Sequence, residues 1–277
     1  MTDKHDYNPL VSIVIPTYNR AEYIRETIQS VISQNYRPLE LVIVDDASTD
    51  STMSIIDELR LPLLKENIKL VLIQNSHNQG CGAALNNGFM IAKGEFISYL
   101  GSDDLLVDPD KTNRQVLVMA HHNADWSYFS DSMIGTELSR AKLFQPTYIP
   151  RFRYLNSFIA RRPRLRLLFL LWRNPINSSS FMVRRIVYLE HGGWQPWTKN
   201  ADCDGLLLMT YSYLGLKCID IDGAPIFYRV HEGQVSLDKK SMETGKSKTK
   251  GHIMNLLETQ NESFIYRKLA KLFRWLG

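Results

Sequence analysis

The first half of the chain alternates short apolar runs with amphipathic segments. One apolar run, Val11–Ile15, leads into a Pro-Thr-Tyr-Asn turn, and a second, Leu41–Val44, stops at two aspartates. Between the two runs, Ile24, Ile28 and Val31 follow the spacing of one face of a helix. The order strand, helix, strand predicts a parallel sheet, because parallel neighbours need a crossover connection.

This alternation continues to about the middle of the chain. Further strands are predicted at Ile68–Asn75 and at Glu95–Asp104, with a helix between them. We expect helix starts at Asn19, Ser48 and Asp108, whose side chains suit the N-terminal cap. Right-handed crossovers would bring the strand ends to one edge of the sheet, which is where such sheets bind ligands.

The second half of the chain is less regular. A short strand is predicted at Asp125–Asp131, a turn, strand and helix at Asn174–Trp194, and a helix at Ala201–Gly215. One or two strands and a polar loop then close the domain by Ser236. We therefore expect one α/β domain over residues 1–237, built on a mostly parallel sheet flanked by helices.

Residues 238–277 predict a C-terminal extension. Asp238–Lys250 is polar and rich in lysine, which predicts a mobile linker. Glu262–Leu276 alternates apolar with basic residues and predicts an amphipathic helix. Such a helix packs on its own domain, packs on a second subunit or lies on an anionic membrane surface. The pattern leaves all three open, and with them the oligomeric state.

The composition agrees with a protein that buries a core. Hydrophobic residues make up 44% of the chain and charged residues 22%, as in ordinary globular proteins. The N-terminus lacks a signal-peptide core, and no apolar run is long enough to cross a bilayer. The three cysteines lack zinc-site spacing, so we expect reduced thiols. We expect a cytoplasmic protein, with peripheral binding at the inner face of the cell membrane left open.

The net charge of +4 is unevenly distributed. Between Leu138 and Leu189 there are many arginines and no Asp or Glu. Such a field attracts phosphate, an anionic glycan or an anionic membrane surface. No DNA- or RNA-binding motif accompanies the charge, so we expect no nucleic-acid partner.

Two pairs of carboxylates follow predicted strands. Asp45 and Asp46 end the second strand, and Asp103 and Asp104 end the fourth. A single pair at such a place commonly caps the next helix. Two pairs at neighbouring strand ends repel one another unless a cation or hydrogen-bond donors compensate. The repetition therefore favours a ligand site over two structural caps.

Two segments, Val11–Thr52 and Gly94–Lys111, resemble the corresponding parts of family 2 glycosyltransferases. The second contains Gly-Ser-Asp-Asp followed by Asp-Pro, similar to the metal-binding motif of that family. The resemblance covers roughly Val11–Ser236 and implies the GT-A fold, a Rossmann-like domain that binds a nucleotide diphosphate sugar. It also implies a divalent metal ion and inversion at the anomeric carbon.

The resemblance implies where the donor and the metal bind. Asp104 is implied as a ligand of Mg²⁺ or Mn²⁺, and Asp103 as a ribose contact or second metal ligand. Many relatives carry Asp where this chain has Gly101, which leaves open which carboxylate binds the ion. A structural role for His231 stays equally open. The residues implied to bind the nucleotide sugar are Pro16, Thr17, Tyr18, Asp45, Asp46, Asn78, Gly80, Asp103, Arg229 and His231.

A third acidic cluster, Asp202 and Asp204, follows Ala201, where many relatives have Glu. The resemblance implies that Asp202 is the general base that takes the proton of the acceptor hydroxyl. The alternative is an acid stabilised by the dipole at a helix N-terminus, which suits Asp204 better. Asn177–Ser180 either offers hydroxyls and an amide to a sugar or forms a Ser-rich turn before a strand.

Together these expectations predict an inverting glycosyltransferase of the hexosyltransferase type. It would move a sugar from a nucleotide diphosphate sugar, with UDP favoured, to a hydroxyl of a glycan or lipid-linked oligosaccharide in surface polysaccharide biosynthesis. Two alternatives are a non-catalytic partner of another transferase that binds nucleotide sugars and a nucleotidyltransferase of related fold. A nucleotidyltransferase should carry a Gly-rich basic loop after the first strand, where this chain has Pro-Thr-Tyr-Asn-Arg.

Overall fold

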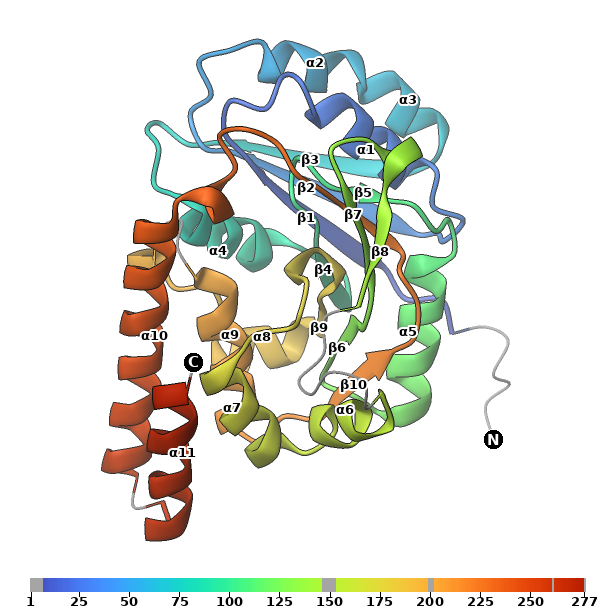
Figure 1. The fold of residues 1–277 in the computed structure, drawn as a ribbon. Coiled ribbons are helices and arrows are strands. Elements are labelled where there is room, and N and C mark those ends of the chain that lie inside the picture. The colour runs from blue at the N-terminus through green and yellow to red at the C-terminus, as the bar shows by residue number, and fades with distance from the viewer. Residues whose placement is uncertain (1–6, 146–152, 199–201, 261, 277) are drawn as a thin grey trace.

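The computed structural model describes residues 7–145, 153–198, 202–260 and 262–276, and a mostly parallel sheet lies at its centre (Figure 1). From edge to edge its strands are β10 (Cys218–Ile221), β6 (Trp126–Phe129), β9 (Met182–Arg184), β4 (Phe96–Tyr99), β1 (Val11–Thr17), β2 (Leu39–Asp45) and β3 (Ile68–Gln74). Among the described residues, every pairing in this sheet is parallel except those of β9. Ala201, which precedes the predicted base, lies outside the described residues.

The alternation of side chains along the strands builds two hydrophobic cores, one on each face of the sheet. In β1, Val14 belongs to one core, whereas Ile13 and Ile15 belong to the other. The register pairs Ile13 with Leu41 and Ile15 with Ile43 of β2, and both partners belong to the same core. Both faces are therefore covered, as expected of a parallel sheet with near-continuous apolar strands.

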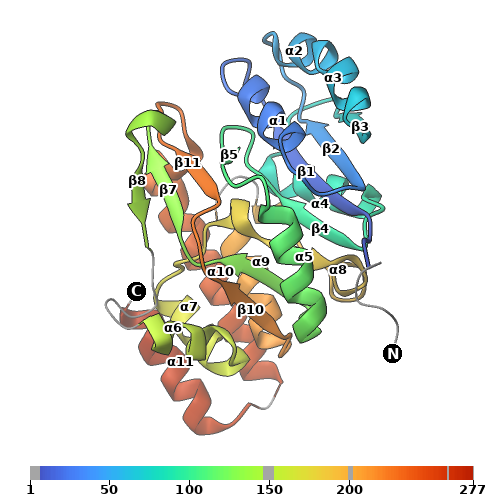
Figure 2. The ribbon, with the colours of Figure 1, turned by 90° about the vertical axis from the view of Figure 1, so that its right-hand side faces the viewer.

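Helices cover both faces (Figures 1 and 2). The helices that fill one core are α1 (Ile24–Ile32), α2 (Thr52–Glu58), α3 (Arg60–Lys65) and α5 (Lys111–His122). Those that fill the other are α4 (Cys81–Ile91), α6 (Arg153–Ala160), α7 (Pro163–Trp172), α8 (Arg185–His191), α9 (Cys203–Tyr213), α10 (Lys239–Thr259) and α11 (Phe264–Leu276). The predicted fold class, a mostly parallel sheet flanked by helices with a C-terminal helical extension, is confirmed.

A second, smaller sheet stands beside the carboxyl ends of the main strands (Figure 2). Its strands are, in order, β5 (Leu105–Leu106), β11 (Ile226–Arg229), β7 (Ser132–Gly135) and β8 (Lys142–Phe144). Short 3₁₀ turns complete the connections at Leu138–Arg140, Ser178–Ser180, Pro196–Thr198 and Val235–Leu237. The sequence does not predict this sheet, because its strands are only two to four residues long. Because β5 directly follows the second acidic pair in the sequence, its pairing with β11 places the end of the domain next to that pair.

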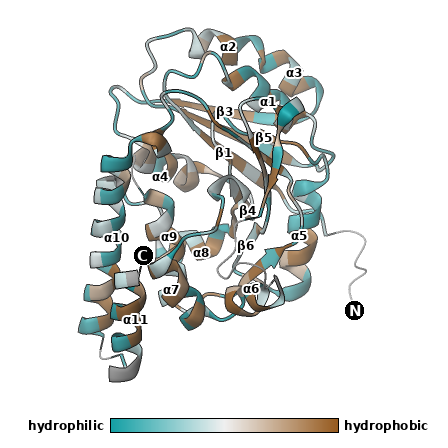
Figure 3. Ribbon diagram, in the orientation of Figure 1, coloured by the Kyte–Doolittle hydropathy of each residue, from teal (hydrophilic) through white to brown (hydrophobic). Residues whose placement is uncertain are grey.

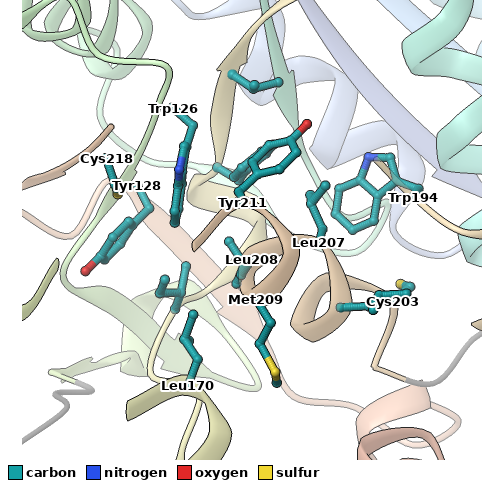
Figure 4. Packing of buried hydrophobic residues seen from close by; sticks show 14 of the residues in the cluster. Trp126, Tyr128, Leu170, Trp194, Cys203, Leu207, Leu208, Met209, Tyr211 and Cys218 are labelled. Atoms are coloured by element: carbon teal, nitrogen blue, oxygen red, sulfur yellow. The ribbon is translucent and has the colours of Figure 1, made fainter. Parts of the chain in front are cut away.

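The core beneath α9 is rich in aromatic side chains. Figure 4 shows Leu207 and Tyr211 of α9 packed between Trp126 and Trp194. The ring centroids of Trp126 and Tyr211 lie 6.3 Å apart. This packing fixes α9, and with it the position of the third acidic cluster at its N-terminus.

Arg166 of α7 is fully buried within this core. Its guanidinium donates to Ser212 Oγ at 2.8 Å, to the Leu216 carbonyl at 2.9 Å and to the Ala160 carbonyl. It also lies 4.8 Å from the centroid of the Trp126 ring. These bonds tie α6 and α7 to α9, because one planar fork satisfies acceptors from each of them.

The helices predicted to start at Asn19, Ser48 and Asp108 begin later in the chain, so these predictions of caps are wrong. The Asn19 N–H donates to Ser48 Oγ at 2.9 Å, and the Thr49 N–H donates to Asn19 Oδ1 at 2.8 Å. Asp108 Oδ1 accepts the N–H of Asp110 at 2.9 Å. The same side chains that could cap a helix instead join two loops or close a turn, which local sequence cannot distinguish.

The segment predicted to be a polar linker, Asp238–Lys250, forms the first half of α10, so that prediction is also wrong. Asp238 caps the helix by accepting the N–H of Ser241 at 3.1 Å. Thr249 and Ile253 are fully buried against α9. Figure 3 shows the polar character of α10 along most of its length. Packing on α9 stabilises a helix that its own composition would not, which is the usual source of helix stability in proteins.

The last helix, α11, packs on its own domain, one of the three possibilities that its sequence left open. Tyr266 and Ala270 are buried, and the Phe273 ring lies 5.1 Å from the ring of Phe169 in α7. Leu272 and Trp275 nevertheless stay exposed, Trp275 by 81%. No helix in the described ranges is long and apolar enough to span a bilayer.

Candidate active site

A cavity of about 260 Å³ opens at the carboxyl ends of the central strands. It is lined by the first βα loop, the loop after β3, the turn after β4, the 3₁₀ turn at Ser178–Ser180 and the N-terminal end of α9. The sequence-predicted site residues that line it are Pro16, Thr17, Tyr18, Asp46, Asn78, Asp103, Asp104 and Asp202. The fold therefore brings residues from both halves of the chain into one cavity.

The first loop presents an open aromatic ring and an orphaned hydroxyl to the cavity. Tyr18 is 42% exposed, which leaves its ring face free to stack on a planar ligand. Thr17 is buried, and its Oγ1 has no hydrogen-bond partner in the described structure. A buried hydroxyl without a partner is costly, so Thr17 is ready to bond to a ligand.

Asp46 holds the loop that follows β3. Its carboxylate accepts the Asn75 side-chain amide at 2.7 Å and the N–H groups of Gln79 and Gly80 at 3.0 and 2.7 Å. Gly80 has φ of 93°, a conformation that favours glycine. These bonds fix the loop that carries Asn78 into the cavity wall.

Asp45 lies fully buried at the end of β2 and accepts the Ser48 N–H at 3.1 Å through Oδ2. Its Oδ1 has no hydrogen-bond partner in the described structure. Asp45 therefore stabilises the βα turn, and it stands outside the set of residues that line the cavity. The two members of this acidic pair thus have different surroundings, which their adjacency in sequence does not reveal.

Asp104 is buried at the turn after β4. Its Oδ2 accepts the Ser179 hydroxyl, and its Oδ1 accepts the Arg229 N–H at 3.2 Å. Burial and the neighbouring charge of Asp103 raise the pKa of Asp104 to about 7. A cation placed here would offset both effects and favour the charged carboxylate.

Asp103 is more exposed and faces two basic side chains. Its Oδ2 lies 3.5 Å from Arg20 Nε and 3.0 Å from His231 Nε2. The His231 Nδ1 lies 2.7 Å from the Glu232 carbonyl, an acceptor, so Nδ1 carries a hydrogen. Nε2 then either pairs with Asp103 as imidazolium or offers a lone pair to a cation.

The second acidic pair fits a divalent metal ion that also binds phosphate. A Cβ built on Gly101 would lie 3.0 Å from Asp104 Oδ2, 3.1 Å from Asp103 Oδ1 and 3.3 Å from Ser179 Oγ. Three oxygens thus converge on one small space, and Mg²⁺ and Mn²⁺ prefer oxygen ligands completed by phosphate and water. Within the described ranges no group of three His, Cys, Asp or Glu side chains forms a closed metal cage. The protein would therefore supply only part of the coordination shell.

Arg229 is positioned behind the acidic pair. Its Nε donates to the Asp103 carbonyl at 3.0 Å, and Nη2 pairs with Glu26 at 2.6 Å. The guanidinium also lies 5.2 Å from the centroid of the Tyr23 ring. In this arrangement Arg229 holds the turn that carries Asp103, and a direct contact with diphosphate would require it to leave Glu26.

Asp202 also lines the cavity, from the N-cap position of α9. It is buried, and its Oδ2 completes no hydrogen bond in the described structure. Burial, followed by the charge of Asp204, raises the pKa of Asp202 to about 7, against the opposing effects of the Thr249 hydroxyl, Lys246 and Lys250. A carboxyl with a pKa near neutrality and a free oxygen is suited to accept a proton.

Asp204 and Gly205 shape the surroundings of Asp202. Asp204 Oδ2 accepts the Ser178 hydroxyl at 3.0 Å, which links α9 to the 3₁₀ turn. A Cβ on Gly205 would overlap the Asp202 carboxylate, so only glycine leaves room for it. Asp204 lies in the first turn of α9, as the alternative of a helix-dipole acid requires, but it also lines the cavity, so its role stays a prediction.

Sequence reasoning missed Arg20, Trp194 and Gly205 as members of the site, and it left the role of Ser179 open within Asn177–Ser180. Trp194 lines the cavity and is almost fully buried, and its Nε1–H has no partner in the part of the chain that the structure describes. Ser179 donates to Asp104 and accepts the N–H of Gly101 at 3.0 Å. The Ser-rich run in the sequence was a signal for Ser179. A single Trp or Gly, such as Trp194 or Gly205, indicates packing as often as ligand binding.

Comparison with known proteins agrees with this geometry. Residues 12–192 match the family described as Glycosyl transferase family 2. Escherichia coli WfaP, named UDP-Glc:alpha-D-GlcNAc-diphosphoundecaprenol beta-1,3-glucosyltransferase, is 28% identical over 234 residues, which are 83% of this chain and 81% of WfaP. The chain spans about a third of the length of the curated Rickettsia relatives that it also matches.

The fold is similar to that of solved GT-A transferases. S. aureus TarS 1-349 in complex with UDP-GlcNAc has a TM-score of 0.71 at 21% identity and covers 95% of this chain and 71% of its own. The mannosyltransferase PcManGT from Pyrobaculum calidifontis, in complex with GDP-Man and Mn²⁺, has a TM-score of 0.67 at 18% identity, covering 98% and 70%. Because the family match runs from the first strand past the acidic pair that lines the cavity, this chain belongs to glycosyl transferase family 2.

Proposed function

We propose that this protein transfers a sugar from a nucleotide diphosphate sugar, with UDP favoured, to a hydroxyl of a glycan or lipid-linked oligosaccharide. The observation that carries the proposal is the content of one cavity. Asp103 and Asp104 line it together with the buried acid Asp202, which comes from the other half of the chain. Carboxyl groups in distinct environments within one site suit a reaction that needs both a bound cation and a proton acceptor.

On the donor side, Asp104 and Asp103 would hold Mg²⁺ or Mn²⁺. The bound ion would neutralise charge on the diphosphate and make it a better leaving group. Arg20 and His231 orient the Asp103 carboxylate, and the orphaned hydroxyl of Thr17 would bond to the nucleotide.

On the acceptor side, Asp202 takes the proton of the acceptor hydroxyl while that oxygen attacks the anomeric carbon. One carboxylate on the face opposite the departing diphosphate is sufficient for transfer with inversion. The free Oδ2 of Asp202 supports this role, since a buried carboxylate oxygen without a partner can accept a hydroxyl proton directly.

The names of the relatives support a place in surface polysaccharide synthesis. WfaP carries a name that specifies a UDP-glucose donor and a diphosphoundecaprenol acceptor, and a relative from Bacillus subtilis is named as a putative teichuronic acid biosynthesis glycosyltransferase. Acceptors of this kind are held in a membrane. We therefore place the protein in the cytoplasm, bound peripherally at the inner face of the cell membrane.

The test of this function compares two acids of the same cluster. Asp202→Asn keeps the size of the side chain but cannot accept a proton, so transfer should fall about 10²- to 10⁴-fold while UDP-sugar affinity stays unchanged. Asp204→Asn is the matched control and should cost much less activity. Asp104→Asn should instead remove the dependence of UDP-sugar binding on Mn²⁺, measured by calorimetry.

Three outcomes would contradict the proposal. Near wild-type transfer by Asp202→Asn would show that Asp202 is not the base. Loss of UDP-sugar binding in that variant would show that Asp202 belongs to the donor side. A wild-type protein that binds UDP-sugars but neither transfers nor hydrolyses them would instead be a non-catalytic partner of another transferase.

A further inference from the structure

The first half of α10 runs beside the acceptor end of the cavity. Met242, near its start, lines the cavity, and Thr249 and Ile253 farther along are fully buried. Figure 1 shows α10 alongside α9, whose N-terminal end carries Asp202. One face of α10 is therefore turned toward the cavity and toward α9.

Two lysines belong to this inward face. Lys246 follows Met242 by four positions and Lys250 follows Lys246 by four, so all three share a side of the helix with Thr249. Lys246 is nevertheless exposed, and Lys250 is half-buried. Of these residues Met242 lines the cavity, and the two lysines extend the same side of the helix beyond it.

The charges of these lysines reach the proposed base without pairing with it. The charges of Lys246 and Lys250 both lower the pKa of Asp202, whereas burial lowers the pKa of Lys250 against the opposing charge of Asp202. The two lysines thus lie close enough to the proposed base to act on it. In the described part of the chain, neither lysine forms an ion pair with a carboxylate.

The need to stabilise the negative charge of Asp202 does not by itself explain why the two lysines lie here. A lysine placed to stabilise a buried carboxylate would contact it, because the Coulomb energy falls with distance and with access of water. Here neither ammonium group forms an ion pair with Asp202 within the described residues, and Lys246 is exposed. Phosphate oxygens are the usual ligands of such convergent, unpaired ammonium groups.

We propose that Lys246 and Lys250 bind a phosphate group of the acceptor and thereby hold the acceptor hydroxyl at Asp202. This inference rests on the proposed function, since it deepens the acceptor side of the same site. It assigns a phosphate-bearing acceptor to the protein. Two sources share that chemistry, a sugar on a lipid diphosphate and a sugar on a phosphodiester-linked polymer.

The experiment measures transfer from UDP-glucose by the full chain to three acceptors that carry the same sugar. One is α-GlcNAc diphosphate with a short alkyl chain, one is a GlcNAc-bearing glycerol phosphate oligomer, and one is the neutral alkyl glycoside. Lys246→Ala with Lys250→Ala should raise KM for a phosphate-bearing acceptor about 10- to 100-fold, with kcat little changed when transfer is measured well above pH 7, where Asp202 is charged with or without the two lysines. KM for the neutral glycoside should stay constant, and the phosphate acceptor that loses more identifies the source.

Lys248→Ala is the matched control, because Lys248 is exposed on the opposite side of the same helix. An equal loss on the neutral glycoside, or no loss on either phosphate acceptor, would overturn the proposal. If wild type uses none of the acceptors, calorimetric binding of the alkyl diphosphate at saturating UDP and Mn²⁺ decides, and equal affinity of wild type and double variant would also overturn it. UDP-glucose binding and hydrolysis, measured in parallel, test the proposed function separately.

Discussion

At the scale of single residues, the site depends on two acids that are buried for different purposes. Asp104 shares its turn with a second carboxylate and with donors from Ser179 and the Arg229 backbone. Among the described residues, no group bonds to one of the oxygens of Asp202. Burial raises the pKa of both to about 7, but only Asp202 is left with an oxygen free to accept a proton.

The raised pKa of Asp202 predicts a pH profile. Below pH 7 the carboxyl is protonated and cannot act as a base, so kcat/KM for the acceptor should rise with pH and reach half its maximum near pH 7. Asp204→Asn removes the second cause of the raised pKa, so its profile should shift to lower pH. Measurement at saturating donor and Mn²⁺ keeps titration of Asp104 out of the profile. A midpoint that does not move in Asp204→Asn would contradict the assignment of Asp202 as base.

Gly205 gives a steric test of the same residue. In Gly205→Ala the new Cβ would overlap the Asp202 carboxylate, so the carboxylate must move and transfer should fall about 100-fold, the scale of misplacing a catalytic group. UDP-sugar affinity should stay constant, because Gly205 is on the acceptor side. Gly251→Ala is the control, since a Cβ there meets nothing within 4 Å. Equal activity of the two variants would show that Asp202 needs no fixed position.

At the scale of elements, the position of Asp202 depends on the packing of α7 and α10 against α9. Arg166 is the strongest single link, because its three donors bond to the Ala160 carbonyl at the end of α6, to Ser212 Oγ in α9 and to the Leu216 carbonyl just after α9.

Lys111, at the start of α5, is a buried cation with fewer hydrogen bonds than Arg166. It is fully buried, its ammonium donates to Ser98 Oγ at 2.8 Å and to no other described residue, and burial lowers its pKa to about 7.

Arg166→Lys should therefore destabilise the fold although it keeps the charge. One ammonium cannot reach all of the acceptors, and each buried acceptor left without a donor costs about 1–3 kcal/mol. We expect a loss of about 3 kcal/mol in the free energy of unfolding, measured by urea denaturation. Arg60→Lys, at an exposed pair with Asp57, should change it by less than about 0.5 kcal/mol. Equal stability of the two variants would mean that α9 is held by apolar packing alone.

At the scale of the whole molecule, the C-terminal helices complete the domain and present a second surface. The inner side of α11 packs on α7, whereas Leu269 and Leu272 are 40% and 48% exposed on its outer side. Lys268 and Lys271 lie beside them. Apolar side chains flanked by basic ones suit the surface of an anionic bilayer.

Leu269→Glu with Leu272→Glu should weaken binding to phosphatidylglycerol vesicles about tenfold, because apolar burial is lost and charge repulsion is added. Leu61→Glu is the control, since Leu61 is 67% exposed on α3, a helix of the opposite face. Sedimentation with vesicles measures the effect. Unchanged binding would leave α11 with a packing role alone, and loss of a dimer on a sizing column would assign its outer side to a second subunit.

The sequence by itself determined the central elements and most of the chemistry. Alternating apolar runs and amphipathic segments are local patterns, so they predicted strands such as β1 and β2 and the helix between them. The acidic pair at Asp103 and Asp104 was visible because the carboxyl ends of parallel strands meet at one edge. The resemblance to the family supplied the role of Asp202, which remains a prediction that the experiments above must test.

Only the tertiary structure decided what surrounds these residues. Asp103 meets His231 across 128 positions of the chain, and Asn19 binds the loop of Ser48 instead of capping a helix. The polar run after Ser236 is a packed helix that brings Lys246 beside the proposed base. Hydrogen bonds and charges act over a few ångströms in space, and which distant residues come that close is set by the packing of the whole domain, not by any local pattern.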